Sequence, residues 1–558
     1  MSGLDRIANV TGEVGERDAA AATVRAGVVL SEMLRTTLGP TGRDKMLVGD
    51  GTVVLTNDGA SIVDRMEIES PAARIVADVA RAQSGEVGDG ATSAIVLAGA
   101  LLDEASSLLD DGFHPTTVVD GYRTAAARAG TVLDDVAWTP DPDDGSTRRN
   151  VVATSITGRW DEARTAFLSD LAVRAFDAVR GSSGRRLSNV TIHGVAGGGT
   201  TDSELLDGLV VDTDASSTSL SEVAAPVPQR VDDARVAVVD DELTIQSPDA
   251  VSRYSFEDVG DLERAQAFET GEYRRYVEAL SAHDVDVLFC QKSVDDRLRT
   301  MLAREGVLVF ERTRQDEVHK LERATGARPV MRLDALDTAS VGRADAVERV
   351  TLGDGAFVIV RESTSSQVSV LLRGGTDHVV DETERIVVDA VGLLDEFDAR
   401  PRLVAGGGAV EVALATDVRR YGRRIGDREA VAVEAFADAL ETIPVSLARN
   451  AGLDPIDSLL ELRRRHADDE TRIGVDGEAG GIADVSDRGV VEPARLKRRV
   501  VANATDAAAL LLRIDGIIET GPSEDGSGGH DHDHDHDGPH AGGEFETDPH
   551  GYPWAIGH

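Results

Sequence analysis

The sequence predicts a multidomain protein of mixed α+β and α/β class. Helical patterns dominate residues 18–135 and 403–513, so we expect one mainly helical domain built from both ends of the chain. From about residue 209 to 372, short β-type runs alternate with helical segments, which predicts an inserted α/β domain. Two glycines follow this insert at 374–375 and predict a hinge.

The composition is strongly acidic. Asp and Glu total 100 against 58 Lys and Arg, which gives a net charge of −42, and only four of the basic residues are lysines. Such a composition is typical of a protein that works in concentrated salt, where charge repulsion is screened. An ordinary acidic cytosolic protein is the alternative. In either case the charge argues against nucleic acid as a partner, because nucleic-acid binding needs a basic surface.

The sequence shows neither a signal peptide nor an apolar run long enough to span a membrane. We therefore expect a cytoplasmic protein without a membrane partner. The single cysteine, Cys290, follows an apolar run at 285–289 and is expected to be a buried strand residue rather than a nucleophile.

Local patterns define the first elements. Residues 18–37 carry apolar side chains at helical spacing, and the Gly-Pro pair after them predicts the end of a helix. Residues 46–55 predict a β-hairpin around a Gly-Asp-Gly turn. The Thr-Asn-Asp-Gly segment at 56–59 is expected to close this hairpin and begin the next helix.

The segment Glu86–Ser93 combines glycines, one carboxylate and two hydroxyls directly before the apolar run at 94–99. It predicts a tight loop that opens a helix, where free amide groups and the positive end of the helix dipole form an anion site. Asp89 would repel a phosphate there unless a divalent cation lay between them, and Mg²⁺ favours one or two carboxylates together with phosphate oxygens. The hypothesis is a loop for a magnesium-bound nucleotide.

A simple turn is the alternative for this segment. The same Gly-Asp-Gly pattern at residues 49–51 and 353–355 is typical of turns between strands. The hydroxyls and the long helical run that follow distinguish residues 88–90. Because neither the Walker pattern nor a convincing dinucleotide fingerprint is found, a nucleotide would have to bind in another way.

The rest of the chain gives coarser signals. A Pro/Asp-rich break at 139–145 predicts a domain boundary, and helices are expected at about 161–180 and 377–396. Residues 242–280 include a polar helical stretch that carries aromatic side chains. Residues 521–558 predict a disordered tail rich in Gly, His and Asp, with weak binding of a divalent metal as the alternative.

A series of short segments resembles one known family. They are residues 36–40, 44–47, 56–60, 88–90, 372–375, 389–390, 406–408, 450–454, 492–493 and 512–515. Together they resemble the group II chaperonins, the family of the archaeal thermosome and its eukaryotic cytosolic relatives. The resemblance runs from about residue 10 to 519, and the acidic composition points to a haloarchaeal member.

The resemblance implies three domains and a tail. They are an equatorial domain from residues 1–140 and 401–520, an intermediate hinge domain from 141–208 and 373–400, an apical substrate-binding domain from 209–372, and the tail at 521–558. The helical stretch at 242–280 would overlap the family's protrusion, which acts as a built-in lid.

The resemblance also implies an ATP site. Asp89 would hold Mg²⁺ with the phosphates, while Asp58 and Asp389 would orient the attacking water. The nucleotide-binding residues would be Leu38, Gly39, Pro40, Gly88, Gly90, Thr92, Ser93, Gly407 and Glu492. Three positions depart from the family pattern: Ala91 replaces the usual Thr, and Thr41 and Arg159 replace Lys.

The implied activity is ATP-driven protein folding. Like subunits would form a double ring whose ATP hydrolysis closes lids over non-native protein clients. One alternative is a stand-alone magnesium-dependent ATPase or phosphotransferase that acts on a small molecule. Another is a ring-shaped scaffold or holdase with feeble turnover, which the loss of a hydroxyl at Ala91 would suit.

Overall fold

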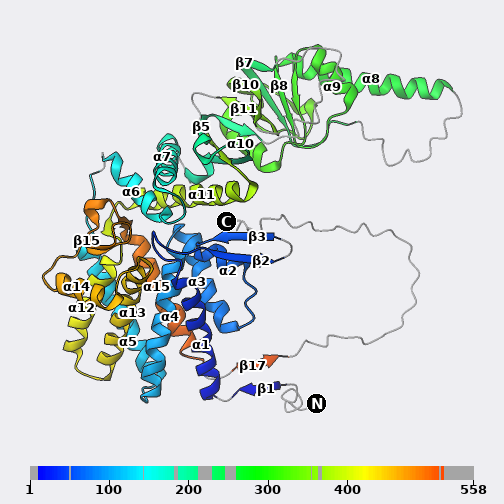
Figure 1. The fold of residues 1–558 in the computed structure, drawn as a ribbon. Coiled ribbons are helices and arrows are strands. Elements are labelled where there is room, and N and C mark those ends of the chain that lie inside the picture. The colour runs from blue at the N-terminus through cyan, green and yellow to red at the C-terminus, as the bar shows by residue number, and fades with distance from the viewer. Residues whose placement is uncertain are drawn as a thin grey trace, which may run out of the picture. The chain divides into compact units, whose positions relative to one another are not determined.

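A computed structural model gives the fold of the chain (Figure 1). It describes residues 10–14, 16–49, 52–141, 144–180, 186–211, 229–244, 259–352, 355–361, 367–514 and 517–520. The chain divides into two units, one from residues 1–15 and 516–558 and the other from residues 16–515. In the first unit, strand β1 (Val10–Val14) pairs antiparallel with β17 (Ile517–Thr520). The predicted tail at 521–558 lies outside the described residues.

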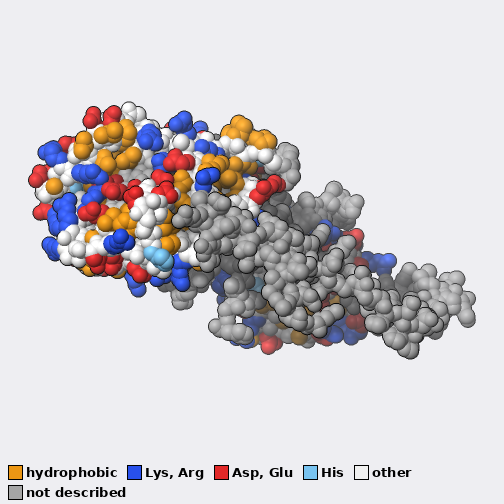
Figure 2. Space-filling model, turned by 90° about the horizontal axis from the view of Figure 1, so that it is seen from below, with side chains coloured by type: hydrophobic (Ala, Val, Ile, Leu, Met, Phe, Trp, Pro, Cys, Tyr) orange, Lys and Arg blue, Asp and Glu red, His pale blue; other side chains and the backbone are white. Residues whose placement is uncertain are grey.

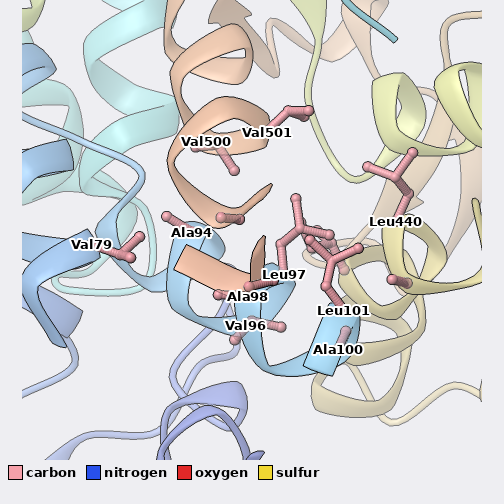
Figure 3. Packing of buried hydrophobic residues seen from close by; sticks show 14 of the residues in the cluster. Val79, Ala94, Val96, Leu97, Ala98, Ala100, Leu101, Leu440, Val500 and Val501 are labelled. Carbon is pink, nitrogen blue, oxygen red and sulfur yellow. The ribbon is translucent and has the colours of Figure 1, made fainter. Parts of the chain in front are cut away.

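Helices from both ends of the chain share one hydrophobic core in the larger unit, as predicted. Helix α4 (Ala91–Asp110) lies inside it and contacts α1, α3, α13 and α15. In Figure 3, Leu97 and Leu101 of α4 lie among side chains from the neighbouring helices. The other helices of this core are α1 (Glu16–Arg35), α2 (Gly59–Arg65), α3 (Pro71–Val87), α5 (Pro115–Val136), α12 (Ala409–Ile425), α13 (Arg428–Asn450) and α15 (Ala494–Leu511). Helix α14 (Pro455–Ala467) contributes Leu462 to a separate hydrophobic cluster that includes residues of β14.

Contrary to the sequence-based expectation, one helix of the described chain, α4, is long and apolar enough to cross a membrane. Most of it is buried inside the protein, and Leu97 and Leu101 are fully enclosed. This burial is what the core helix of a globular protein shows, so its apolar composition is explained by packing.

Short strand pairs accompany these helices. The predicted hairpin is confirmed: β2 (Lys45–Gly49) pairs antiparallel with β3 (Thr52–Thr56). Two further antiparallel pairs are present. The pair of β13 (Leu403–Ala405) with β16 (Val491–Pro493) joins distant segments, whereas β14 (Ile473–Asp476) and β15 (Gly481–Asp484) form a second hairpin.

A smaller α/β region follows α5. Its three-stranded sheet has the order β4 (Val190–Ala196), β12 (Val368–Gly374), β5 (Glu204–Asp207), with β4 and β12 parallel. Helices α6 (Gly145–Ile156), α7 (Glu162–Val179) and α11 (Asp377–Ala399) share a hydrophobic cluster with this sheet. Helix α11 matches the helix expected at 377–396. Strand β12 crosses the boundary expected at 372/373, because its hydrogen bonds join it to β4 rather than to the inserted sheet.

The inserted region forms a six-stranded mixed sheet, which confirms its α/β character. The strand order is β6 (Leu209–Val211), β11 (Gly355–Arg361), β10 (Gly342–Leu352), β7 (Arg230–Val239), β8 (Val287–Cys290), β9 (Leu308–Phe310). Helices α8 (Val259–Ala282), α9 (Asp296–Arg304) and α10 (Gln315–Thr325) belong to it. Cys290 is fully buried in β8, as predicted.

Charged side chains of both signs mix on the surface. In Figure 2, acidic and basic side chains alternate over the described face that is turned to the viewer, with hydrophobic side chains between them. The excess of acid therefore does not gather into a single patch on that face.

Candidate nucleotide site

A cavity of about 530 Å³ opens in the larger unit where segments from both halves of the chain meet. The residues from the sequence-based site that line it are Leu38, Gly39, Pro40, Asp58, Asp89, Gly90, Thr92, Ser93, Gly407 and Glu492. Gly88 and Asp389 are outside the lining but adjoin it. Gly88 precedes Asp89, and a Cβ atom built on Gly88 would lie 3.0 Å from the Asp389 carbonyl oxygen. The structure thus brings all twelve predicted residues into one region.

The loop between α3 and α4 forms one wall. Helix α3 ends at Gly88 and α4 begins after Gly90, and both glycines have left-handed backbone conformations, with φ of 79° and 84°. Because Gly90 has no side chain, no side chain caps the first amide groups of α4. A helix start of this kind is a site for anionic groups. The predicted loop-to-helix transition is confirmed.

The Asp89 side chain is held inside this loop. Its Oδ1 atom accepts a 2.6 Å hydrogen bond from the Gly90 amide, and the Gln83 side chain donates to the Asp89 carbonyl oxygen over 2.9 Å. Among the described residues, no group of three or more His, Cys, Asp or Glu side chains forms a complete metal-binding cluster. A metal at Asp89 would therefore need ligands from a bound molecule or from water.

Helix α2 begins beside α4. Asp58 caps α2 and accepts a 2.8 Å hydrogen bond from the Ser61 amide. The Gly59 amide donates to Thr92 Oγ1 over 3.1 Å, which joins the two helix starts. The Asp58 carboxylate is consequently fixed at the cavity near the Asp89 loop.

Backbone segments from distant positions also approach one another closely at the cavity. A Cβ atom at Gly158 would lie 2.7 Å from the Gly39 carbonyl oxygen, and one at Gly407 would lie 2.6 Å from the Val475 carbonyl oxygen. Both glycines also have positive φ angles. Larger residues would force these segments apart, so glycine is required at both positions for this close approach.

Five charged side chains gather where α11 meets the starts of α2 and α4. Arg159 Nη2 lies 3.1 Å from Asp58 Oδ1, and Arg159 Nη1 lies 3.7 Å from Glu382 Oε1. Arg385 contacts three carboxylates: those of Asp58 (3.0 Å), Glu382 (2.7 Å) and Asp389 (3.2 Å). This cluster connects α11 to the edge of the cavity.

Comparison with known proteins identifies the family. Residues 30–522 match the TCP-1/cpn60 chaperonin family. The chain belongs to this family. It is similar to thermosome subunit alpha of Halobacterium salinarum, with 40% identity over 516 residues that cover 92% of this chain and 91% of the relative. Thermosome subunit 1 of Haloferax volcanii is 39% identical over 528 residues, which cover 94% and 93% of the two chains.

A further relative comes from a third organism. The thermosome subunit of Methanopyrus kandleri is 40% identical over 511 residues, covering 90% of this chain and 92% of the relative. The chain is therefore a group II chaperonin of the thermosome kind, which uses ATP in protein folding. This confirms the family and the activity that the sequence segments implied.

The three carboxylates at the chaperonin cavity have different electrostatic environments. Burial raises the pKa of Asp89, against the hydrogen bond from the Gly90 amide. Burial also raises the pKa of Asp389 to about 7, and the Arg385 guanidinium offsets this only in part. Burial acts in the same direction on Asp58, but Arg159 and Arg385 outweigh it, so the pKa of Asp58 is lowered.

Glu492 shares one lysine with a second glutamate. Lys497 Nζ lies 2.7 Å from Glu492 Oε2 and 2.8 Å from Glu411 Oε1. Burial raises the pKa of Glu492 to about 7, although Lys497 favours its charged form. Burial opposes the charge on Lys497, but the two glutamates outweigh it and raise the pKa of the lysine.

Several cavity residues escaped the sequence analysis. Trp160, Asp476 and Lys497 line the cavity, and Arg385 and Glu382 complete the charged cluster beside it. The only signal for Arg385 was its helical spacing of four residues before Asp389, which places both side chains on one face of α11. The spacing indicates a shared site only when it is known that α11 lies beside Asp58.

Proposed function

We propose that this cavity is the ATP-hydrolysing site of the chaperonin. The observation that carries the proposal is that residues 38–40, 89–93, 407–408 and Glu492, widely separated in the sequence, line one cavity at the start of α4. Helix amide groups and glycine backbones are the groups that bind phosphates closely. Leu38, Gly39, Pro40 and Gly407 would enclose the nucleotide, and Glu492 would lie near its base or ribose.

The residues present fit a magnesium ion. Asp89 supplies one carboxylate beside free helix amides, and phosphate oxygens and water complete the set of ligands that Mg²⁺ favours. When bound, Mg²⁺ would neutralise phosphate charge. Gly88 and Gly90 shape the loop, while the backbone and hydroxyl groups of Thr92 and Ser93 are available to donate to phosphate oxygens.

Asp389 is proposed as the general base. Its carboxylate would accept a proton from water while the water oxygen forms a bond to the terminal phosphorus and the bond from that phosphorus to its bridging oxygen breaks. Asp58, whose lowered pKa keeps it ionised, would orient the water. Positioning of this kind supplies most of the catalysis in phosphoryl transfer.

Hydrolysis would drive closure of a folding chamber. We propose that like subunits form a double ring in the cytoplasm and that the chamber encloses non-native protein. Residues 1–140 and 401–520 would form the equatorial domain, with the intermediate domain at 141–208 and 373–400 and the apical domain at 209–372. On the contacts of β12, residues 368–372 would move with the intermediate domain.

Two variants separate binding from turnover. Asp89→Ala removes the metal ligand, so it should weaken magnesium-ATP binding as well as hydrolysis. Asp389→Ala should keep ATP affinity while turnover falls by about 10²-fold or more, because a general base acts in the transition state. Equilibrium nucleotide binding and steady-state phosphate release in molar salt measure both effects. Near-normal turnover in Asp389→Ala would refute the role of Asp389, and equal loss of binding in both variants would refute the division of roles.

A further inference from the structure

Four charged side chains beside the cavity form a closed network. Asp58 contacts Arg159, Arg159 contacts Glu382, Glu382 contacts Arg385, and Arg385 returns to Asp58. The network joins the start of α2, the segment between α6 and α7, and α11. Charges of opposite sign alternate around it, so each member is held by two partners.

Arg385 occupies a special place in this network. Its Nη1 atom lies 3.0 Å from Asp58 Oδ2 and 3.2 Å from Asp389 Oδ2, so a single nitrogen connects the two carboxylates. Its Nη2 atom lies 2.7 Å from Glu382 Oε1. Without a cation between them, Asp58 and Asp389 would repel each other. A planar guanidinium, always charged, holds several carboxylates in a fixed geometry, which an ammonium group does less well.

We propose that Arg385 is a positioning residue for ATP hydrolysis, which holds Asp58 and Asp389 side by side so that both face the attacking water. This inference rests on the proposed function. Glu382 contacts Arg385 directly, and Arg159 fixes both Asp58 and Glu382 because its two terminal nitrogens contact them separately. Through its contact with Glu382, Arg159 extends the network to α11.

The role predicts an effect on turnover and not on nucleotide affinity. Arg385 does not line the cavity itself, so its removal leaves the phosphate-binding loop intact. Arg385→Gln should lower kcat by about 10- to 100-fold, because misplaced carboxylates no longer orient the water. The KM for ATP should change by less than about threefold. Arg385→Lys, which keeps the charge but loses the fork, should recover part of the lost kcat.

A matched control tests general damage to α11. Arg180 Nη2 lies 2.8 Å from Asp398 Oδ1, near the far end of the same helix, and does not belong to the closed network. Arg180→Gln should therefore retain nearly normal kcat and KM. All variants are compared as assembled particles of normal size. If Arg180→Gln lowers kcat as much as Arg385→Gln, the inference is wrong, because any loosening of α11 would then suffice.

A double variant shows whether Arg385 acts through Asp389. If it does, adding Arg385→Gln to Asp389→Asn should lower kcat by clearly less than the loss of about 10- to 100-fold expected for Arg385→Gln alone, and the remaining loss reflects its contact with Asp58. A full further loss in the double variant, a large rise in KM, or normal kcat in Arg385→Gln would overturn the inference. Normal kcat in Asp389→Asn would instead refute the proposed function, so the two failures are distinguishable.

Discussion

Asp58 and Asp389 contact the same guanidinium nitrogen, yet their pKa values shift in opposite directions. Asp58 has two arginine partners and a backbone hydrogen bond, which keep it ionised. Among the described residues, Asp389 has one recorded ion-pair partner, Arg385, and the effect of burial on its pKa outweighs the opposing charges of Arg385 and Arg159. One carboxylate is thus always negative at neutral pH, whereas the other is poised to gain and lose a proton. Such a difference between neighbouring carboxylates suits one of them to proton transfer.

The dependence of kcat on pH should follow the ionisation of Asp389. The carboxylate of Asp389 accepts a proton only when ionised, so kcat should rise with pH through the value of about 7. Between pH 6 and pH 8 the expected rise is about tenfold, which is the change in the ionised fraction of a single group. Phosphate release at saturating magnesium-ATP in molar salt measures it. A flat kcat over this range would show that Asp389 is not the group that limits turnover.

At the scale of elements, structure that depends on local sequence patterns was predicted, whereas contacts between distant segments were not. The hairpin at 45–56 and the start of α4 were predicted because alternation, turn residues and glycines act over a few positions. Helix α6 was not predicted, because its apolar residues Val151, Val152 and Ile156 occupy only its second half. The pairing of β12 with β4 joins residues far apart in the chain, which no local pattern encodes.

In the candidate site too, residues within short motifs were predicted, and residues that depend on long-range contacts were not. The glycines and acids of the site were found from the family motifs, whereas the partners that tune them were missed. Lys497, for example, gains its role only when α15, α12 and β16 come together around it. Its environment depends on tertiary contacts that composition and spacing do not contain.

Lys497→Met should therefore destabilise the contact between these elements. The variant leaves the buried carboxylates of Glu411 and Glu492 without their cation, and breaking a buried ion pair costs about 3–5 kcal/mol. Thermal or denaturant unfolding at neutral pH gives the free-energy change. The added substitution Glu411→Gln removes one of the stranded charges and should restore part of the stability. An unchanged unfolding midpoint in Lys497→Met would show that the lysine is dispensable to the fold.

At the scale of the whole molecule, charge governs association. Each subunit carries a net charge of −42, and assembly brings many such subunits together. Ion pairs such as Arg128 with Asp417 and Arg495 with Glu396 lie within the subunit, and they leave this excess unchanged. Self-repulsion of this size must be screened by salt. The sequence-based expectation of a protein that works in concentrated salt stays a prediction.

Lowering the salt concentration should dissociate the particle. At molar salt the Debye length is about 3 Å, whereas at about 0.1 M it reaches about 10 Å, so that neighbouring subunits repel one another. Sedimentation velocity across this range should show loss of the large species. Each salt concentration is measured with and without magnesium-ATP, so that an effect of the nucleotide on assembly can be separated from the effect of salt. A sedimentation profile that does not change would contradict the expectation.

The position of α4 has a consequence for synthesis of the chain. The ribosome produces this most apolar helix early, but its partners α13 and α15 come only near the end. Until α13 and α15 are made, the nascent chain can cover this hydrophobic helix only in part, with the earlier helices α1 and α3. The cavity is completed equally late, since Glu492 follows Asp89 by some four hundred residues in sequence order. If this cavity binds the nucleotide, as we propose, only the finished subunit can bind it.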